Sequence, residues 1–163
     1  MIVRDFRESD VTPANALTNE VILRTAIHFA YEPASDADFA AMWRKGSEKF
    51  PWLAGEDQGR FLGYCKAGIW RDRDAYRRTV ETGIYVAADA RGKGVGRAMY
   101  QVLFSRLRQA GIRTVVAGIT LPNDASVRLH EGLGFQKVGV FRAVGYKFDA
   151  WHDVGFWQID FGG

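Results

Sequence analysis

The feature that most constrains this chain is residues 81–97, which combine a β-strand pattern, a short polar turn and a glycine-punctuated loop leading into a helix. Glycine at every second position of the loop leaves the backbone bare, so a ligand can approach it closely. The glycines are Gly92, Gly94 and Gly96, and the basic residues around them are Arg91, Lys93 and Arg97. The helix that begins near Gly94 adds free N–H groups and the positive end of its dipole. The stretch therefore predicts an anion site, with phosphate as its expected ligand.

Two familiar phosphate motifs do not fit residues 91–96. A dinucleotide fingerprint needs Gly-x-Gly-x-x-Gly near the first strand and an acidic residue about 20 positions later. A P-loop ends in Gly-Lys-Ser/Thr, which is missing here. The remaining interpretation is a pyrophosphate cradle in the middle of the chain, with a generic glycine-rich connection as the alternative.

Hydrophobic periodicity along the chain predicts a single mixed α/β domain, residues 1–163, with about seven strands and four helices. The expected strands are 2–6, 51–55, 60–69, 80–87, 114–119, 135–141 and 155–161. The expected helices are 14–25, 35–49, 94–110 and 123 to 132 or 134, with surface loops at 70–79 and 146–151. The buried face of the second helix is expected to carry Phe39, Met42 and Trp43. The apolar stripe of the third is expected to be Val95, Ala98, Met99, Val102, Leu103 and Leu107.

Composition narrows the class of protein and its partners. A net charge of +3 without a long Lys/Arg run gives no nucleic-acid face. No apolar run approaches the ~20 residues that span a bilayer, and residues 1–10 do not resemble a signal peptide, so we expect a cytoplasmic protein without membrane contact. The one cysteine, Cys65, excludes an internal disulfide framework, and we expect no metal site.

Several stretches together resemble the GNAT superfamily of N-acetyltransferases. Arg91-x-Gly-x-Gly follows a strand, and Asn123 and Gly134-Phe135 come later, as in that family. Residues 80–86, 121–131, 145–147 and 151–158 are similar to the phosphinothricin acetyltransferase group, which also includes methionine sulfone and sulfoximine acetyltransferases. The resemblance covers nearly the whole chain and is strongest from about Tyr76 onward.

The resemblance implies a mixed, mostly antiparallel GNAT-like sheet of about seven strands and an acetyl-CoA-dependent N-acetyltransferase. The acceptor would be the α-amine of a small amino acid such as phosphinothricin, methionine sulfone or methionine sulfoximine, and a homodimer is expected. The implied acetyl-CoA-binding residues are Ile84, Tyr85, Val86, Arg91, Gly92, Lys93, Gly94, Val95, Gly96, Arg97, Asn123 and Ser126.

Three chemical roles follow from transfer of an acetyl group from a thioester to an amine. The acceptor ammonium must lose a proton, and Glu81 resembles the family's catalytic base, with an ion pair to Arg77 or Arg78 as the alternative reading. A backbone N–H near Val86 would stabilise the oxyanion. His130 would protonate the departing thiolate, or else is a structural histidine on a short helix.

The acceptor pocket would use cations for the amino-acid carboxylate and oxo groups, together with aromatic walls. The expected residues are Phe29, Arg71, Arg73, Tyr76, Arg78, Thr82, Gly83 and Tyr146. Gly83 departs from the bulkier residue usual in the family, which would reshape this pocket. Because Cys65 lies in an apolar strand with no adjacent base, we expect direct transfer in a ternary complex. The alternatives are acetylation of a protein N-terminus, a polyamine or an aminoglycoside, or a non-catalytic CoA-binding sensor.

Overall fold

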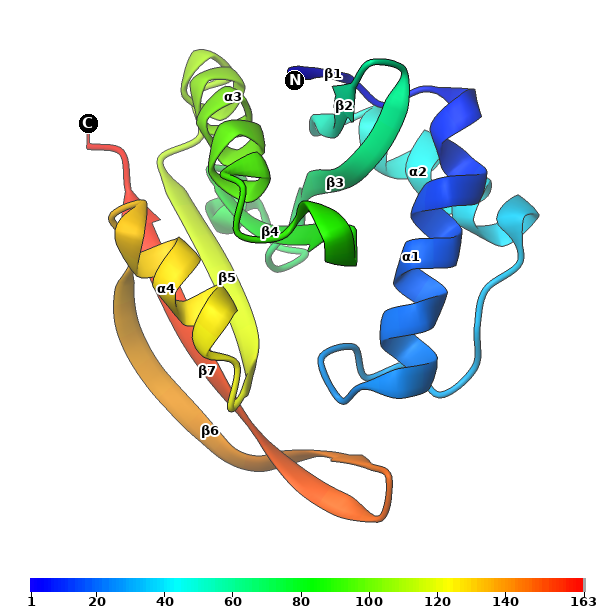
Figure 1. The fold of residues 1–163 in the computed structure, drawn as a ribbon. Helices are drawn as coiled ribbons and strands as arrows, with labels where there is room; N and C mark the ends of the chain where they lie inside the picture. Colours follow the sequence, from blue (N-terminus) through cyan, green and yellow to red (C-terminus); the bar gives the residue numbers. More distant parts are fainter. Residues whose placement is uncertain (163) are drawn as a thin grey trace.

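The computed structural model describes residues 1–162, so Gly163 of the expected domain lies outside the described residues. Seven strands form one sheet, and four α-helices cover its two faces (Figure 1). The strands are β1 (Ile2–Asp5), β2 (Trp52–Asp57), β3 (Arg60–Ile69), β4 (Thr79–Val86), β5 (Thr114–Leu121), β6 (Gln136–Lys147) and β7 (Ala150–Asp160). The helices are α1 (Val11–Arg24), α2 (Asp36–Ser47), α3 (Val95–Gln109) and α4 (Asp124–Gly132).

The sheet order is β1-β2-β3-β4-β5-β7-β6, and every neighbouring pair is antiparallel except β4 with β5. This confirms the mixed, mostly antiparallel sheet expected from the sequence. The parallel pair is short, running only from Thr79 opposite Thr114 to Glu81 opposite Val116. Beyond that point β4 and β5 diverge, and the sheet is open between them (Figure 1).

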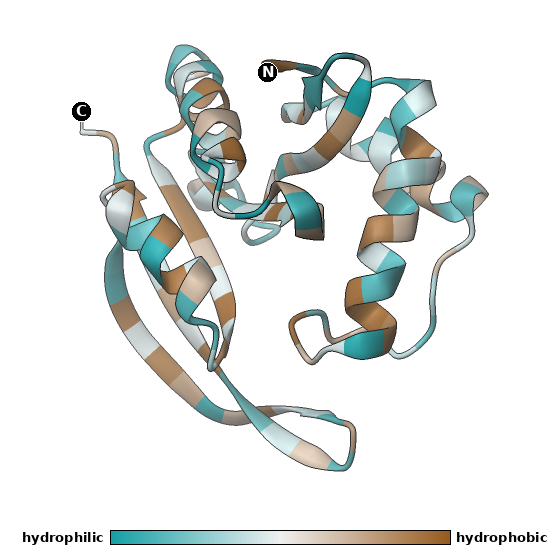
Figure 2. Ribbon diagram, in the orientation of Figure 1, coloured by the Kyte–Doolittle hydropathy of each residue, from teal (hydrophilic) through white to brown (hydrophobic). Residues whose placement is uncertain are grey.

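The two faces of the sheet carry two separate cores. α3 supplies six of the eighteen buried residues of the larger core, including Met99, Tyr100 and Leu103, which are fully buried. The smaller core is aromatic and joins α1 and α2 to β2 and β3. The helices show alternating hydrophobic and hydrophilic segments, as helices packed on a sheet should (Figure 2).

Two details of the expected helix faces are wrong. Met42 is 43% exposed because it lies at the rim of α2, so only Phe39 and Ala40 of that helix are fully buried. In α3 the buried face also includes Tyr100 and Phe104, whose rings stack with centroids 5.2 Å apart. The buried stripe is therefore wider than aliphatic spacing indicated.

The expected aromatic loop at 146–151 is also wrong, because this segment is the end of a long β-hairpin. β6 continues to Lys147 and β7 starts at Ala150, with Tyr146 directly opposite Trp151. Only Phe148 and Asp149 form the turn, both with positive φ (53° and 54°), as a two-residue hairpin turn requires. Without the usual glycine, the turn is not evident from the sequence.

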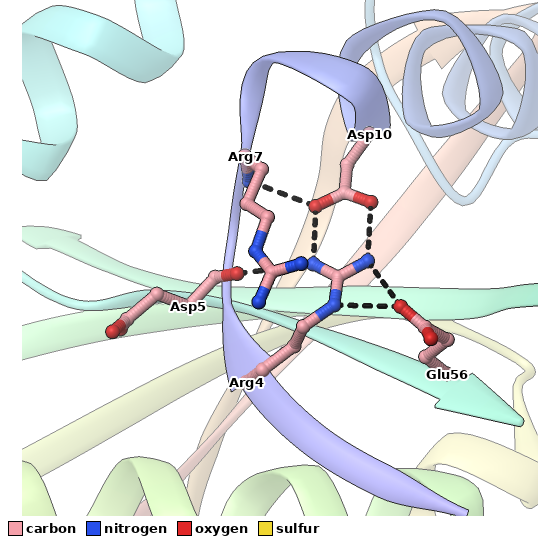
Figure 3. Close-up of polar contacts among 5 residues, drawn as sticks. All are labelled: Arg4, Asp5, Arg7, Asp10 and Glu56. Carbon is pink, nitrogen blue, oxygen red and sulfur yellow. Dashed lines mark hydrogen bonds and ion pairs between the residues drawn. The ribbon is translucent and has the colours of Figure 1, made fainter. Parts of the chain in front are cut away.

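An ion-pair network fixes the N-terminal strand against the sheet. The Arg4 guanidinium donates two hydrogen bonds to Asp10 (2.7 and 2.9 Å) and one to Glu56 (2.7 Å), as Figure 3 shows. Asp10 is 3% exposed and also accepts from the Arg7 backbone N–H. The two carboxylates hold the pKa of Arg4 above its usual range. The network joins β1, β2 and the start of α1.

None of the helices within residues 1–162 combines the length and apolar character needed to cross a membrane.

The N-cap of α2 is as expected, with the Ser35 hydroxyl accepting from the Asp38 N–H. Taken together, the helices form two layers, one on each face of a single sheet that is split between β4 and β5.

Candidate active site

A groove of about 540 Å³ lies at the split between β4 and β5. All the predicted acetyl-CoA residues line it except Lys93, which is exposed on the loop. The structure thus brings together residues separated by about 40 positions in the chain, from Ile84 to Ser126. Sequence reasoning missed part of the lining: Leu17, Val21, Thr25, Ile27, Ala90, Ala125, Arg128 and Leu129. Leu17 and Val21, which belong to α1, show an ordinary helical spacing that is equally typical of residues in a hydrophobic core.

The glycines of the loop serve two different purposes. Gly92 and Gly94 have φ of 74° and 80°, the left-handed region that favours glycine, and a Cβ at either would meet no atom within 4 Å. Gly96 lies inside α3, where a Cβ would be 3.1 Å from Leu129 Cδ2 and 3.4 Å from Ile84 Cδ1. Two glycines therefore shape the turn, and the third lets α3 approach α4 and β4 closely.

The loop ends at the N-terminus of α3, with Gly94 as N-cap. The first N–H groups of any helix have no partner within that helix, so those of α3 face the groove as an anion site. The Arg91 side chain donates to the Val86 carbonyl (3.0 Å) and the Arg97 side chain to the Gly132 carbonyl (2.9 Å). These two arginines also fix the loop against β4 and α4.

The end of β4 presents backbone N–H groups to the groove. The Ala87 N–H donates to Leu62 O (2.9 Å), and hydrogen-bonded and non-bonded pairs alternate along an antiparallel ladder. Val86 opposite Gly63 and Ile84 opposite Cys65 are therefore non-bonded pairs. Their N–H groups point away from β3, toward the opening that β5 has left.

Glu81 lies on the same strand, on the opposite side of the sheet from α3. Side chains alternate along a strand, so Glu81, Gly83 and Tyr85 share the face of the aromatic core that contacts Tyr85. A Cβ on Gly118 of β5 would be 3.4 Å from Glu81 Oε1 and 3.1 Å from Phe156 Cε1, so this bare glycine makes room for the carboxylate. Burial raises the pKa of Glu81, and the positive charge of Lys66 opposes that shift. No ion pair with Arg77 or Arg78 is present within residues 1–162.

His130 lies beneath the groove rather than in it. The residue is 3% exposed, its Nδ1 lies 2.8 Å from Ser126 O, and its Nε2 lies 3.0 Å from the Tyr100 hydroxyl. A carbonyl oxygen only accepts, so Nδ1 carries the proton and Nε2 accepts from Tyr100. Burial lowers the pKa of His130, which favours this neutral form. The contacts match the structural alternative, and the role of acid stays a prediction.

Tyr100 is a residue that the sequence did not indicate. Its hydroxyl lies 3.3 Å from Thr82 Oγ1 as well as 3.0 Å from His130 Nε2, and it is fully buried. Thr82 therefore belongs to this buried network, on the α3 side of the sheet. The structure does not bring Thr82 to the face that carries Glu81.

The other predicted acceptor residues fall into two groups. Arg71, Arg73 and Tyr76 line a pocket of about 340 Å³ with Asp72, on the loop between β3 and β4. Arg78 is exposed, and its carbonyl accepts from the N–H groups of Arg113 and Thr114. These residues are linked to Glu81 through two aromatic rings. Trp70, which precedes this loop, packs on Phe156 with ring centroids 5.7 Å apart, and Phe156 and Glu81 both lie beside Gly118.

Phe29 and Tyr146 both lie at the end of the β6–β7 hairpin. The Phe29 ring contacts Gly145, where a Cβ would be 2.2 Å from Phe29 Cζ, and the Tyr146 carbonyl accepts from the Tyr31 hydroxyl. Lys147, 4% exposed, donates to the carbonyls of Ile22 (2.5 Å) and His28 (2.7 Å). The hairpin thus holds the loop that follows α1, and that loop lies beside the groove.

The chain is similar to known proteins over nearly its whole length. The sequence profile described as "Acetyltransferase (GNAT) family" matches residues 18–135. The chain is 38% identical over 159 residues to a phosphinothricin N-acetyltransferase of Streptomyces viridochromogenes, covering 98% of this chain and 87% of that protein. It is 34% identical over 161 residues to an L-methionine sulfoximine/L-methionine sulfone acetyltransferase of Salmonella typhimurium (98% and 94%). A phosphinothricin acetyltransferase of Sinorhizobium meliloti, solved with acetyl-CoA, superimposes with a TM-score of 0.94 at 32% identity, covering 99% of this chain and 88% of that chain.

Proposed function

This chain belongs to the GNAT family of acetyltransferases, and on that basis we propose that it transfers an acetyl group from acetyl-CoA to a small amino acid. The acceptor atom is the α-amine of a compound such as phosphinothricin, methionine sulfone or methionine sulfoximine, the substrates in the names of its relatives. Transfer is direct, in a ternary complex, with Glu81 as the base.

The observation that carries this proposal is the arrangement of β4. One end of the strand holds a half-buried carboxylate, and the other end faces a groove with unpaired N–H groups and a helix N-terminus. At ~3.3 Å per residue, the Cα atoms of Glu81 and Ile84 are about 10 Å apart. Glu81 therefore takes the proton of the acceptor ammonium directly or through one water.

The groove fits the parts of acetyl-CoA. The α3 N-terminus with Gly92 and Gly94 suits the pyrophosphate, and the strip between Val86 and Asn123 suits the pantetheine arm. Acetyl-CoA supplies the acetyl group as a thioester. The N–H of Val86 donates to the thioester oxygen, where negative charge develops during transfer.

Direct transfer is supported by the state of the one cysteine. Cys65 is fully buried in β3, and burial raises the pKa of its thiol well above the usual range. A thiol in that state is a poor nucleophile, because the thiolate is the reactive form. The acetyl group therefore passes to the acceptor without an acetyl-cysteine.

The test is a thiol-release assay with acetyl-CoA across amino acids, their sulfones and sulfoximines, polyamines, aminoglycosides and peptides. We expect turnover with the amino-acid class and a loss of about 10²-fold or more in kcat for Glu81→Gln. Turnover only with a polyamine, aminoglycoside or peptide N-terminus would replace this acceptor class. Acetyl-CoA binding with no turnover on any acceptor would instead indicate a CoA-binding sensor.

We also propose a homodimer through the β6–β7 hairpin. β6 is an edge strand with brown, hydrophobic segments along its ribbon (Figure 2), and the hairpin exposes large apolar side chains. They are Val138, Phe141, Val144, Tyr146, Phe148 and Trp151. An apolar edge of this kind favours pairing with a second copy. Light scattering should give a dimer that Val138→Glu dissociates, whereas Ile2→Glu at the opposite sheet edge should not.

A further inference from the structure

Lys66 is a cation on the acceptor face of the sheet whose role is not explained by the fold. It is partly buried on β3, and its Nζ lies 4.7 Å from the centroid of the Trp52 ring. Among residues 1–162 the only acceptor that its Nζ reaches is Met42 Sδ, at 3.9 Å. An ammonium has three donors and seldom stays buried without an oxygen partner. The side chain is therefore free to bind an anion.

Gly83 is the reason that Lys66 can lie where it does. The two residues are directly opposite each other on β3 and β4. A Cβ on Gly83 would be 3.7 Å from Lys66 Cε and 3.9 Å from Lys66 Cγ, so the lysine stem covers the bare glycine. A larger side chain at position 83 would occupy the space that the stem fills.

The spacing between Lys66 and Glu81 suits an amino acid. Glu81 is opposite Gly68, so Glu81 and Lys66 are diagonal neighbours on one face, ~7–8 Å apart with their Cβ atoms somewhat closer. They form no direct ion pair within the described residues, although each charge influences the other. An α-amino acid carries the complementary pair of charges, an ammonium for Glu81 and a carboxylate for Lys66.

The charges around this position favour an anion. Burial lowers the pKa of His28 on the loop after α1, and the positive charges of Lys147 and Lys66 lower it further, so both charges act on the same region. Burial lowers the pKa of Lys66, and the negative charge of Glu81 opposes that shift. Once Glu81 has engaged an amine, the region is left with positive charge that an acceptor carboxylate would neutralise.

We propose that Lys66 is a specificity-determining residue that binds the α-carboxylate of the acceptor while Glu81 holds its amine. The inference rests on the proposed function, because it assigns the acceptor side of that site. Lys66 would select amino acids over amines that lack a carboxylate. It would disfavour polyamines and aminoglycosides, because it repels their additional positive charges.

The experiment compares L-methionine sulfone with its carboxamide, which keeps the amine and the sulfone but lacks the anionic carboxylate. The variants are Lys66→Met, which keeps the stem, and Lys66→Arg, which keeps the charge. Lys45→Met, at an exposed position on α2, is the control for removing one positive charge. kcat/KM is measured for both acceptors at saturating acetyl-CoA.

We expect Lys66→Met to lower kcat/KM for the acid by about 10- to 100-fold, the effect of one hydrogen bond between charged groups. The carboxamide should change little, so the ratio of acid to carboxamide collapses, while Lys66→Arg and Lys45→Met retain it. An unchanged ratio in Lys66→Met overturns the inference. If the wild-type protein acetylates neither compound nor any other amino acid, the proposed function itself fails, which is a different result.

A second variant gives the same comparison without removing the lysine. Gly83→Thr places atoms where the Lys66 stem lies and should displace the ammonium, lowering the ratio of acid to carboxamide. Gly83→Ala adds only a Cβ at ordinary contact distance and should preserve the ratio. If Lys66→Met does not fold, as judged by thermal melting, this pair decides the inference: equal ratios in the two Gly83 variants overturn it.

Discussion

The Tyr100–His130 contact allows a prediction about what the histidine does. Tyr100→Phe removes one hydroxyl from a fully buried site and leaves the ring packing on Phe104 intact. His130 Nε2 then has no donor, since the residue is 3% exposed and Nδ1 is engaged with Ser126 O. Thr82 Oγ1 keeps a weak contact to Val116 O at 3.5 Å.

The expected cost follows from these contacts. A buried polar group left unsatisfied costs ~1–3 kcal/mol, and Tyr100→Phe leaves one nitrogen fully unsatisfied and one hydroxyl partly so. We therefore expect the free energy of unfolding to fall by about 2 kcal/mol. For a chain of this length that lowers Tm by about 4–8 °C.

The assay is urea and thermal unfolding of a double-mutant cycle. His130→Leu removes the acceptor as well as the ring, so Tyr100→Phe/His130→Leu should be about 1–2 kcal/mol more stable than the two single effects predict. Tyr64→Phe is the matched control, because within residues 1–162 its buried hydroxyl hydrogen-bonds only to Thr18 Oγ1 (2.7 Å). It should cost about 1 kcal/mol.

The outcome also distinguishes the two roles of His130. A structural histidine predicts lower Tm and weaker acetyl-CoA binding in His130→Leu, because α4 carries Ser126 of the groove. A general acid predicts a large loss of kcat with Tm and cofactor affinity unchanged. If Tyr100→Phe costs less than Tyr64→Phe, the neutral, hydrogen-bonded histidine assigned above is refuted.

Three further predictions concern charge. Burial lowers the pKa of His130 in the native state, so below about pH 6.5 the unfolded chain binds more protons than the folded one. The free energy of unfolding should therefore fall as the pH drops from about 6.5. Urea titrations from about pH 8 to 5 check this, and a flat profile contradicts it. Arg91→Ala with Lys93→Ala should raise the Kd of acetyl-CoA about 10-fold or more in calorimetry while the fold persists, and an unchanged Kd would remove the phosphate assignment. Lys147→Met should speed hydrogen exchange in the loop that follows α1 while α3 stays protected, whereas unchanged exchange would show that the buried lysine does not hold that loop.

Much of the fold and the groove could be predicted because the relevant patterns are local. The near-continuous apolar run of β5, the Ser35 cap and the glycines before α3 each report on a few adjacent residues. The hairpin turn at Phe148 and Asp149 could not be predicted, since no residue type there requires positive φ.

The acceptor side of the site could not be predicted because it depends on pairing between strands. Lys66 and Gly83 are separated by 17 positions, and only the β3–β4 register makes them neighbours. The contact of Tyr100 with His130 likewise needs α3 and α4 to be packed side by side. Tyr100 was not indicated because the aliphatic residues of the same helix already accounted for a buried face.

The burial of Cys65 has a practical consequence for any measurement of this enzyme by released thiol. The chain contributes one thiol, and in the folded state it is inaccessible, so a thiol reagent reports coenzyme A alone. The same thiol lies in the larger core, packed between the sheet and α3, and becomes available only when that core opens. A slow second phase of one equivalent per chain would then measure the opening of the core, in the same cuvette and without an added label.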